Sequence, residues 1–165
     1  MNRILTGIAL LALTTTASAN LSLEFREGAP KDRFIVSNIG DCTLTDMAIT
    51  IDFKDSAGKL IFDITNEGAG VEVFQPFEIE SGSKFLTQTP DVVDGQTQIT
   101  LNMTAFEAGK KIVASTDLDD TVGTREITVT ASEFSGTVVN VTIDGNVYTT
   151  KMNDKPEAVV ELNGC

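Results

Sequence analysis

Histidine and tryptophan are both absent from the 165 residues, and tyrosine occurs once. Without histidine the chain has no Ser-His-Asp or Cys-His relay, no imidazole general base and no histidine-ligated zinc site. Positive charge is also scarce: 12 lysine and arginine residues stand against 24 aspartate and glutamate residues, for a net charge of −12. A surface this negative repels phosphate backbones and anionic lipid, so neither a nucleic-acid partner nor a membrane surface is expected.

Long hydrophobic runs are also missing. The apolar stretch Ile4–Leu13 follows Arg3 and precedes Ala17-Ser18-Ala19, and this order is typical of a cleaved signal peptide. The stretch is too short to cross about 30 Å of hydrocarbon, so membrane insertion is not expected. We predict a signal peptide over residues 1–19 and one domain over residues 20–165, exported to the periplasm or the medium. A buried N-terminal helix is the alternative.

Cys42 and Cys165 are the only cysteines. Export would place them in an oxidising compartment, where two cysteines usually pair. A Cys42–Cys165 disulfide would close most of the mature chain, and the chain-entropy model gives such a loop roughly 4–5 kcal/mol. We predict this structural bridge; an intermolecular disulfide and free thiols are the alternatives.

The mature sequence alternates apolar and polar residues with the period of a half-buried strand, and no stretch of 12 residues has helical spacing. β-Branched residues dominate these runs, as they do in sheets. The expected strands are centred on Leu21–Phe25, Phe34–Val36, Met47–Phe53, Lys59–Ile64, Val71–Val73, Ile99–Met103, Lys110–Asp117, Ile127–Val129, Val139–Ile143, Val147–Met152 and Ala158–Leu162.

Turn residues separate these runs, and Asp144-Gly145 gives the strongest hairpin signal because both residues tolerate positive φ. Many short strands with frequent turns favour two packed antiparallel sheets over a closed barrel. The predicted fold is all-β: a single immunoglobulin-like antiparallel β-sandwich of roughly ten strands. The phenylalanines are expected in its core.

The densest acidic cluster is Asp117, Asp119 and Asp120, at the exit of the expected strand Lys110–Asp117. Carboxylates this close repel unless water or a cation relieves the repulsion. Calcium takes six to eight oxygen ligands in loose geometry, so we expect these three residues to form a calcium site. The helical calcium-loop motif does not fit, and a solvated turn is the alternative. Loop acids that could complete the site are Glu27, Asp32, Asp41, Asp46, Asp91, Asp94 and Asp154.

No enzyme signature is present. Ser56-Ala57-Gly58-Lys59 and Ser81-Gly82-Ser83-Lys84 match the Ser-x-x-Lys string of β-lactamase-type enzymes, but they lack its companion strings and fall in glycine-containing turns. A hydrolase using two carboxylates is a further possibility, which would need a pocket with two converging acids and a raised pKa. We therefore expect no catalytic residues.

Several strings together resemble one family. They are Glu27–Phe34, Leu60–Asp63, Gly70–Glu78, Asp117–Thr121 and Arg125–Val129. They resemble bacterial exported proteins named "aggregation factor core", after a sponge extracellular proteoglycan component that mediates calcium-dependent cell adhesion. The resemblance implies an extracellular or periplasmic recognition module with calcium as its cofactor.

The expected function is accordingly non-enzymatic binding or adhesion, assisted by calcium at the acidic loop, with a protein or glycan surface as partner. The alternative is a structural or accessory periplasmic domain without a metal, whose acidity only keeps it soluble. The sequence does not specify an oligomeric state.

Overall fold

The computed structural model describes residues 18–28, 31–68, 75–122 and 129–162. In these ranges the chain forms eleven strands and two short 3-10 helices, η1 (Ser83–Phe85) and η2 (Ala131–Phe134). No helix in these ranges is long and apolar enough to cross a membrane. The strands are β1 (Ala19–Arg26), β2 (Asp32–Asn38), β3 (Leu44–Asp52), β4 (Ile61–Phe62), β5 (Glu78–Ser81), β6 (Gln98–Phe106), β7 (Lys111–Thr116), β8 (Leu118–Asp119), β9 (Val138–Ile143), β10 (Asn146–Lys151) and β11 (Glu157–Leu162).

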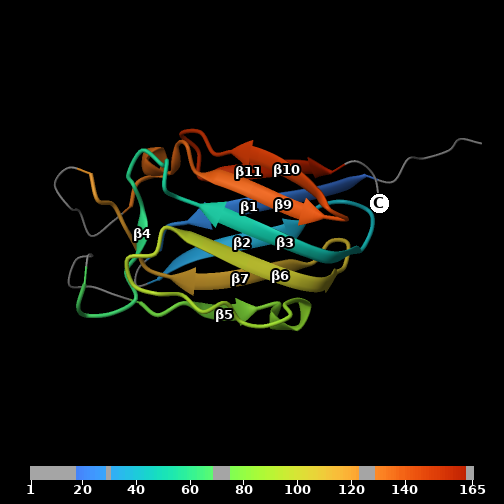
Figure 1. The fold of residues 1–165 in the computed structure, drawn as a ribbon, viewed down its shortest axis with the longest axis horizontal. Helices are drawn as coiled ribbons and strands as arrows, with labels where there is room; N and C mark the ends of the chain where they lie inside the picture. Colours follow the sequence, from blue (N-terminus) through green and yellow to red (C-terminus); the bar gives the residue numbers. More distant parts are fainter. Residues whose placement is uncertain (1–17, 29–30, 69–74, 123–128, 163–165) are drawn as a thin grey trace, which may run out of the picture.

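The strands form two large sheets and a small ribbon, and all their pairings are antiparallel. One sheet has the order β11-β1-β2-β7-β5, the other β10-β9-β3-β6, and β4 pairs with β8 in the ribbon. Figure 1 shows the two sheets stacked, with β10 and β11 along one edge, β5 along the opposite edge and β4 at one end. This arrangement confirms the predicted antiparallel β-sandwich.

The alternating sequence pattern explains the core. In β1, Leu21, Leu23 and Phe25 are 2–4% exposed, whereas Ser22 and Glu24 between them are half-buried. The same alternation runs through β3, β6 and β9, so each sheet turns one apolar face toward the other. Seven phenylalanines are buried between the layers: Phe25, Phe34, Phe53, Phe62, Phe85, Phe106 and Phe134.

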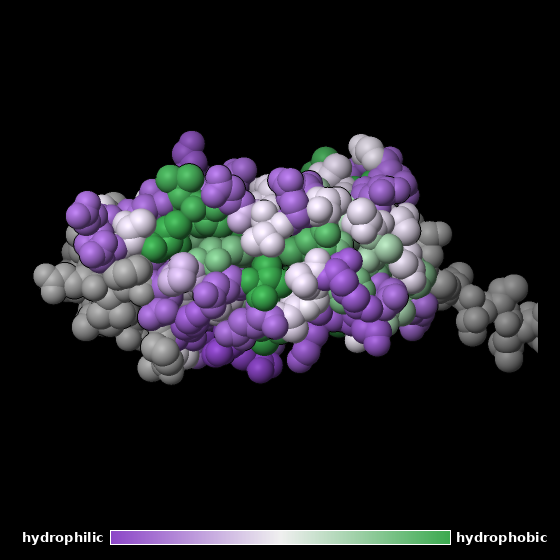
Figure 2. All heavy atoms as spheres, turned by 90° about the horizontal axis from the view of Figure 1, so that it is seen from below, coloured by the Kyte–Doolittle hydropathy of each residue, from purple (hydrophilic) through white to green (hydrophobic). Residues whose placement is uncertain are grey.

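The outer surface is largely hydrophilic. Figure 2, seen from the side of β5, shows hydrophilic side chains that break up small hydrophobic areas. Two of the exposed large hydrophobic residues, Val147 and Val159, line one groove between β10 and β11. The large hydrophobic residues that are exposed in the described ranges come otherwise from separate segments. Together they are Ile39, Val93, Val122, Val147 and Val159.

The predicted hairpin at Asp144-Gly145 is confirmed. β9 and β10 pair directly across it, from Ile143 opposite Asn146 to Val138 opposite Lys151. Asp144 has φ 49° and Gly145 has φ 75°, so both central residues take the left-handed conformation that this tight turn requires.

Two predicted strands are shorter than expected. The expected strand Lys59–Ile64 is reduced to β4, and the expected strand Lys110–Asp117 ends at Thr116. Because β7 is paired on both sides within the five-stranded sheet, the chain must leave that sheet at Asp117 to reach β4 as β8.

The remaining differences have local reasons. β5 was not predicted, because its sequence Glu-Ile-Glu-Ser offers one apolar residue at a largely exposed edge. Val129 is buried but lies outside any strand. The strand expected at Val71–Val73 falls outside the described residues. Ile127, the first residue of the strand expected at Ile127–Val129, does so too.

The chain ends bear on the export and disulfide predictions. Ala19 begins β1 opposite Leu162 and is 1% exposed, so the predicted cleavage point falls inside this strand. Cys42 is half-buried against the core and is not a free cysteine. Cys165 lies outside the described residues, so the Cys42–Cys165 pairing stays a prediction, as does the signal peptide.

Candidate metal centre

The β4–β8 ribbon places three carboxylates on one face. Its register pairs Ile61 with Asp119 and Phe62 with Leu118, and the Asp63 amide donates a hydrogen bond to the Asp117 carbonyl at 3.2 Å. Side chains alternate along a strand, so Asp63, Asp117 and Asp119 point to the side opposite Phe62 and Leu118. The two apolar residues are fully buried in the core.

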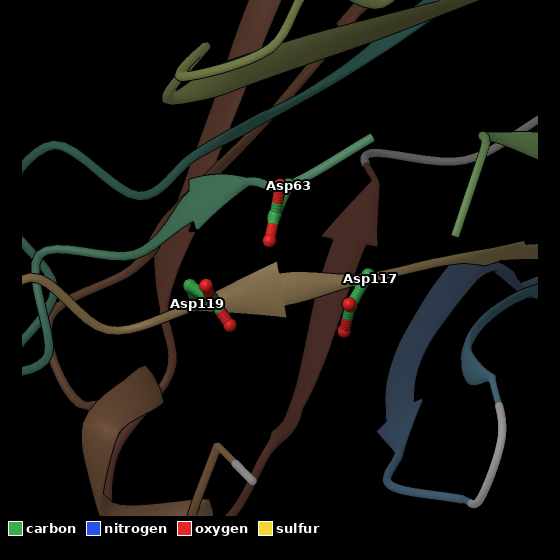
Figure 3. Close-up of side chains that lie close together, drawn as sticks. All are labelled: Asp63, Asp117 and Asp119. Atoms are coloured by element: carbon green, nitrogen blue, oxygen red, sulfur yellow. The ribbon is translucent and has the colours of Figure 1, made fainter. Parts of the chain in front are cut away.

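The three side chains converge. One carboxylate oxygen from each of Asp63, Asp117 and Asp119 lies within 4.8 Å of the other two. Figure 3 shows Asp63 pointing from the end of β4 toward β8, where Asp117 and Asp119 lie at the two ends of the strand. Asp63 and Asp119 are 1% and 2% exposed, and Asp117 is half-buried. Three acidic groups therefore share a small volume that is nearly closed to solvent.

Two further acids border this group. Asp94, in the loop before β6, acts electrostatically on Asp63, and Asp32, the first residue of β2, acts on Asp117. The Gly28 amide donates a hydrogen bond to Asp32 Oδ1 at 3.2 Å, which fixes this carboxylate. The site thus draws on four segments of the chain that are distant in sequence.

Burial and mutual repulsion raise the pKa values of these carboxyls. Burial, followed by the charges of Asp119 and Asp94, raises the pKa of Asp63 to about 7. Burial, followed by Asp119, Asp32 and Asp63, raises the pKa of Asp117 to about 7. Burial likewise raises the pKa of Asp32 to about 6. Near neutral pH, these groups therefore need protons or a cation to balance their charge.

One oxygen of the group lacks a hydrogen-bond donor. Asp63 Oδ2 is buried and has no hydrogen-bond partner among the described residues. The groups that act most strongly on Asp63 are the carboxyls of Asp119 and Asp94 rather than lysine or arginine. A buried carboxylate oxygen without a donor is costly in a stable fold, and a bound cation is one way to satisfy it.

The structure distinguishes among the predicted ligands. It brings Asp117 and Asp119 together, as expected, but it does not group Asp120 with them. Asp120 is 3% exposed, and its Oδ1 accepts a hydrogen bond from the Val122 amide at 3.0 Å, which closes a local turn. Asp120 therefore shapes the chain after β8 instead of facing the other two acids.

The sequence prediction missed Asp63. Of the loop acids named as possible partners, Asp32 and Asp94 do border the site. The missing signal was the antiparallel match between Ile61-Phe62-Asp63 and Asp117-Leu118-Asp119, in which Asp63 and Asp117 lie beside the apolar pair on one side and Ile61 faces Asp119 on the other. Two strands of two residues are too short to be paired from sequence alone.

The Ser-x-x-Lys strings are structural. Ser56 is fully buried, and its Oγ accepts a hydrogen bond from the Leu60 amide at 3.0 Å within the turn before β4. Ser83 and Lys84 lie in η1, a single turn of 3-10 helix at the surface. Neither string forms the buried helical start that such an enzyme uses.

Comparison with known proteins adds little to this geometry. No protein-family model matches the sequence, and no curated protein is significantly similar to it. Among solved structures, the chain is similar to a biomass-sensing module from Rsgi-like proteins of Clostridium thermocellum, which is described as resembling a family 3 carbohydrate-binding module of the cellulosome. The two share 16% identity with a TM-score of 0.34, over 82% of this chain and 98% of that one. A match at this level carries no argument about function.

Proposed function

We propose that the protein is an exported, non-enzymatic binding module that holds a calcium ion between Asp63, Asp117 and Asp119. The observation that carries the proposal is the convergence of three carboxylates around the buried Asp63 Oδ2, which has no hydrogen-bond donor in the described chain. Without a cation, these carboxyls must take up protons to avoid burying like charges.

Calcium suits this donor set. Two oxygens bound to one calcium ion at about 2.4 Å are at most about 4.8 Å apart, and the three carboxylates already lie within that distance of one another. The ligands are hard oxygens, which disfavours zinc and copper. The half-buried Asp117 leaves solvent access on one side, from which waters could complete the six to eight ligands that calcium takes.

The ion would add a further tie between the two strands of the ribbon. The β4–β8 ribbon is two residues long on each strand and belongs to neither large sheet. Calcium bound to both of its strands would hold this end of the sandwich in one shape, on which a protein or glycan surface could dock. The resemblance to the aggregation factor core family, with its link to calcium-dependent adhesion, supports the same function.

The geometry favours binding over hydrolysis. Convergent acids and a raised pKa are also what a two-carboxylate hydrolase would need, but Asp63 and Asp119 are 1% and 2% exposed, which leaves a substrate no access to both. A groove of about 470 Å³ lies instead between β10 and β11, and Glu161 is the only acid among the residues that line it. A lone carboxylate does not provide the acid and base pair of that mechanism.

Calcium should stabilise the folded protein. If the ion binds only the native state, it adds about 2.7 kcal/mol when its concentration is 100 times the Kd. We expect calorimetry at pH 7.5 to show a higher melting temperature in millimolar calcium than in EGTA. No shift would contradict the calcium proposal and favour the structural, metal-free domain.

Two variants define the ligand set. Asp63→Asn should abolish the calcium-dependent shift, because it removes the charge of the central ligand. Asp120→Asn is the matched control: its amide oxygen can still accept the hydrogen bond from Val122, and we expect the calcium response to persist. If Asp120→Asn abolishes the calcium response and Asp63→Asn keeps it, the ligands are instead Asp117, Asp119 and Asp120, as predicted from the sequence.

A further inference from the structure

Asp94 fixes the chain segment that follows Asp63. Its Oδ1 accepts hydrogen bonds from the amides of Ile64 at 3.0 Å and Thr65 at 3.3 Å. One aspartate thus ties down the first two residues after the central carboxylate of the acidic group. Because these two backbone amides occupy Asp94 Oδ1, this oxygen does not act as a metal ligand.

The other carboxylate oxygen of Asp94 lies against Gly68. A Cβ atom added to Gly68 would meet Asp94 Oδ2, and the φ of +133° at Gly68 favours glycine. The segment 64–68 therefore curves around the Asp94 carboxylate. Its residues 65–68 are exposed, which makes this curved segment part of the outer surface beside the site.

The loop that carries Asp94 is itself anchored to β4. The Gly95 amide donates to the Phe62 carbonyl at 2.8 Å, and the Phe62 amide donates to the Gln96 carbonyl at 2.9 Å. The two bonded residues follow Asp94 directly in the chain, so Asp94 is held next to Phe62, the residue that precedes Asp63. The charge of Asp94 is consequently among those that raise the pKa of Asp63.

From these contacts we infer that Asp94 is a positioning residue, which aims Asp63 at the ion and transmits ion occupancy to the surface segment 64–68. The inference rests on the proposed calcium site. With no ion, the ionised Asp63 carboxylate and Asp94 repel each other across the base of this segment. An ion at Asp63 offsets that repulsion, so the bonds from Ile64 and Thr65 to Asp94 strengthen and the segment becomes more ordered.

Hydrogen exchange of the full chain tests the coupling. We expect calcium to slow amide exchange in residues 64–68 at least several-fold, while a peptide from β3 or β6 changes little. This measurement needs no substitution, so it does not depend on the stability of a variant. Unchanged exchange in residues 64–68 of a calcium-saturated protein would overturn the inference.

Two substitutions test the positioning role. Asp94→Ala should weaken calcium binding in titration calorimetry by about 10- to 100-fold, the usual loss when a group that orients a metal ligand is removed. Asp94→Asn should recover most of that affinity, because an amide oxygen can accept both backbone hydrogen bonds. Asp91→Ala, an exposed change in the same loop, should bind like the wild type.

The outcomes separate the two proposals. A wild type that binds no calcium refutes the calcium site and this inference together. A wild type that binds calcium, with Asp94→Ala binding equally well, refutes the inference alone. If Asp94→Asn binds as weakly as Asp94→Ala, the charge of Asp94 matters rather than its hydrogen bonds, and the positioning role is also refuted.

Discussion

Acidifying the metal-free protein from pH 8 to pH 5 is expected to stabilise it, by roughly 3 kcal/mol. The carboxyls of Asp63 and Asp117 have pKa values of about 7 in the fold, against an ordinary value of 3.8. The native state therefore binds more protons than the unfolded state between pH 4 and pH 7. Stability contributed by these groups is fully present below pH 4 and is lost as the pH rises through 7.

The size of this effect follows from the shifts. A single carboxyl with these two pKa values gains roughly 2–3 kcal/mol over three pH units. Asp32, whose pKa is raised to about 6, adds to this in the same direction. The three groups are coupled and Asp117 is half-buried, so the total should stay well below the sum of three independent terms.

Urea unfolding between pH 5 and pH 8, on protein stripped of divalent cations by a chelating resin, measures this dependence. Asp63→Asn should flatten it and stabilise the metal-free protein at pH 8 by about 2 kcal/mol, because the amide carries no charge and can donate to neighbouring carboxylates. Asp91→Asn removes one exposed charge from a nearby loop and should leave the pH dependence intact. A stability that rises from pH 5 to pH 8 would contradict the assigned environment of the acidic group.

Phe53→Ala is expected to destabilise the protein by about 3–5 kcal/mol. Phe53 is fully buried directly after β3, and its ring lies 5.8 Å from Phe34, 5.7 Å from Phe62 and 6.2 Å from Phe134 between centroids. These partners come from the five-stranded sheet, the ribbon and η2. Truncation would therefore leave a cavity where several layers meet, and aromatic contacts would be lost with it.

Thermal or urea unfolding measures this loss, with Val147→Ala as the control. Val147 is 63% exposed on β10, so its truncation should change stability by less than about 0.5 kcal/mol. A cost for Phe53→Ala close to that of the control would contradict the packing of the aromatic core.

The sequence predicted the fold well because burial on a strand repeats every second residue. The inner face of β1 is predicted by the spacing of Leu21, Leu23 and Phe25, without reference to any other strand. β5 carried no such signal, since a short edge strand buries too little to require an alternating pattern. The expected strand Lys110–Asp117 ends early, at Thr116, where β7 is paired on both sides, and only the assembled sheet reveals this pairing.

Two of the three residues of the acidic site were predictable for a similar reason. Asp117 and Asp119 are close in the chain, so their shared face follows from strand geometry. Asp63 lies more than 50 residues away and joins them only through the pairing of Ile61 with Asp119. Asp120 was included because it is adjacent in sequence, but the turn to Val122 directs its carboxylate elsewhere.

Because side chains alternate along a strand, one face of the β4–β8 ribbon packs in the core and the other carries the acidic group. Leu118 fills the core while its neighbours on either side, Asp117 and Asp119, supply the carboxylates. Deleting or inserting one residue in this stretch would exchange the roles, driving a carboxylate into the apolar interior and a leucine into the charged cluster. A substitution changes one side chain of the ribbon, whereas a one-residue insertion or deletion would disrupt its core face and its acidic face together.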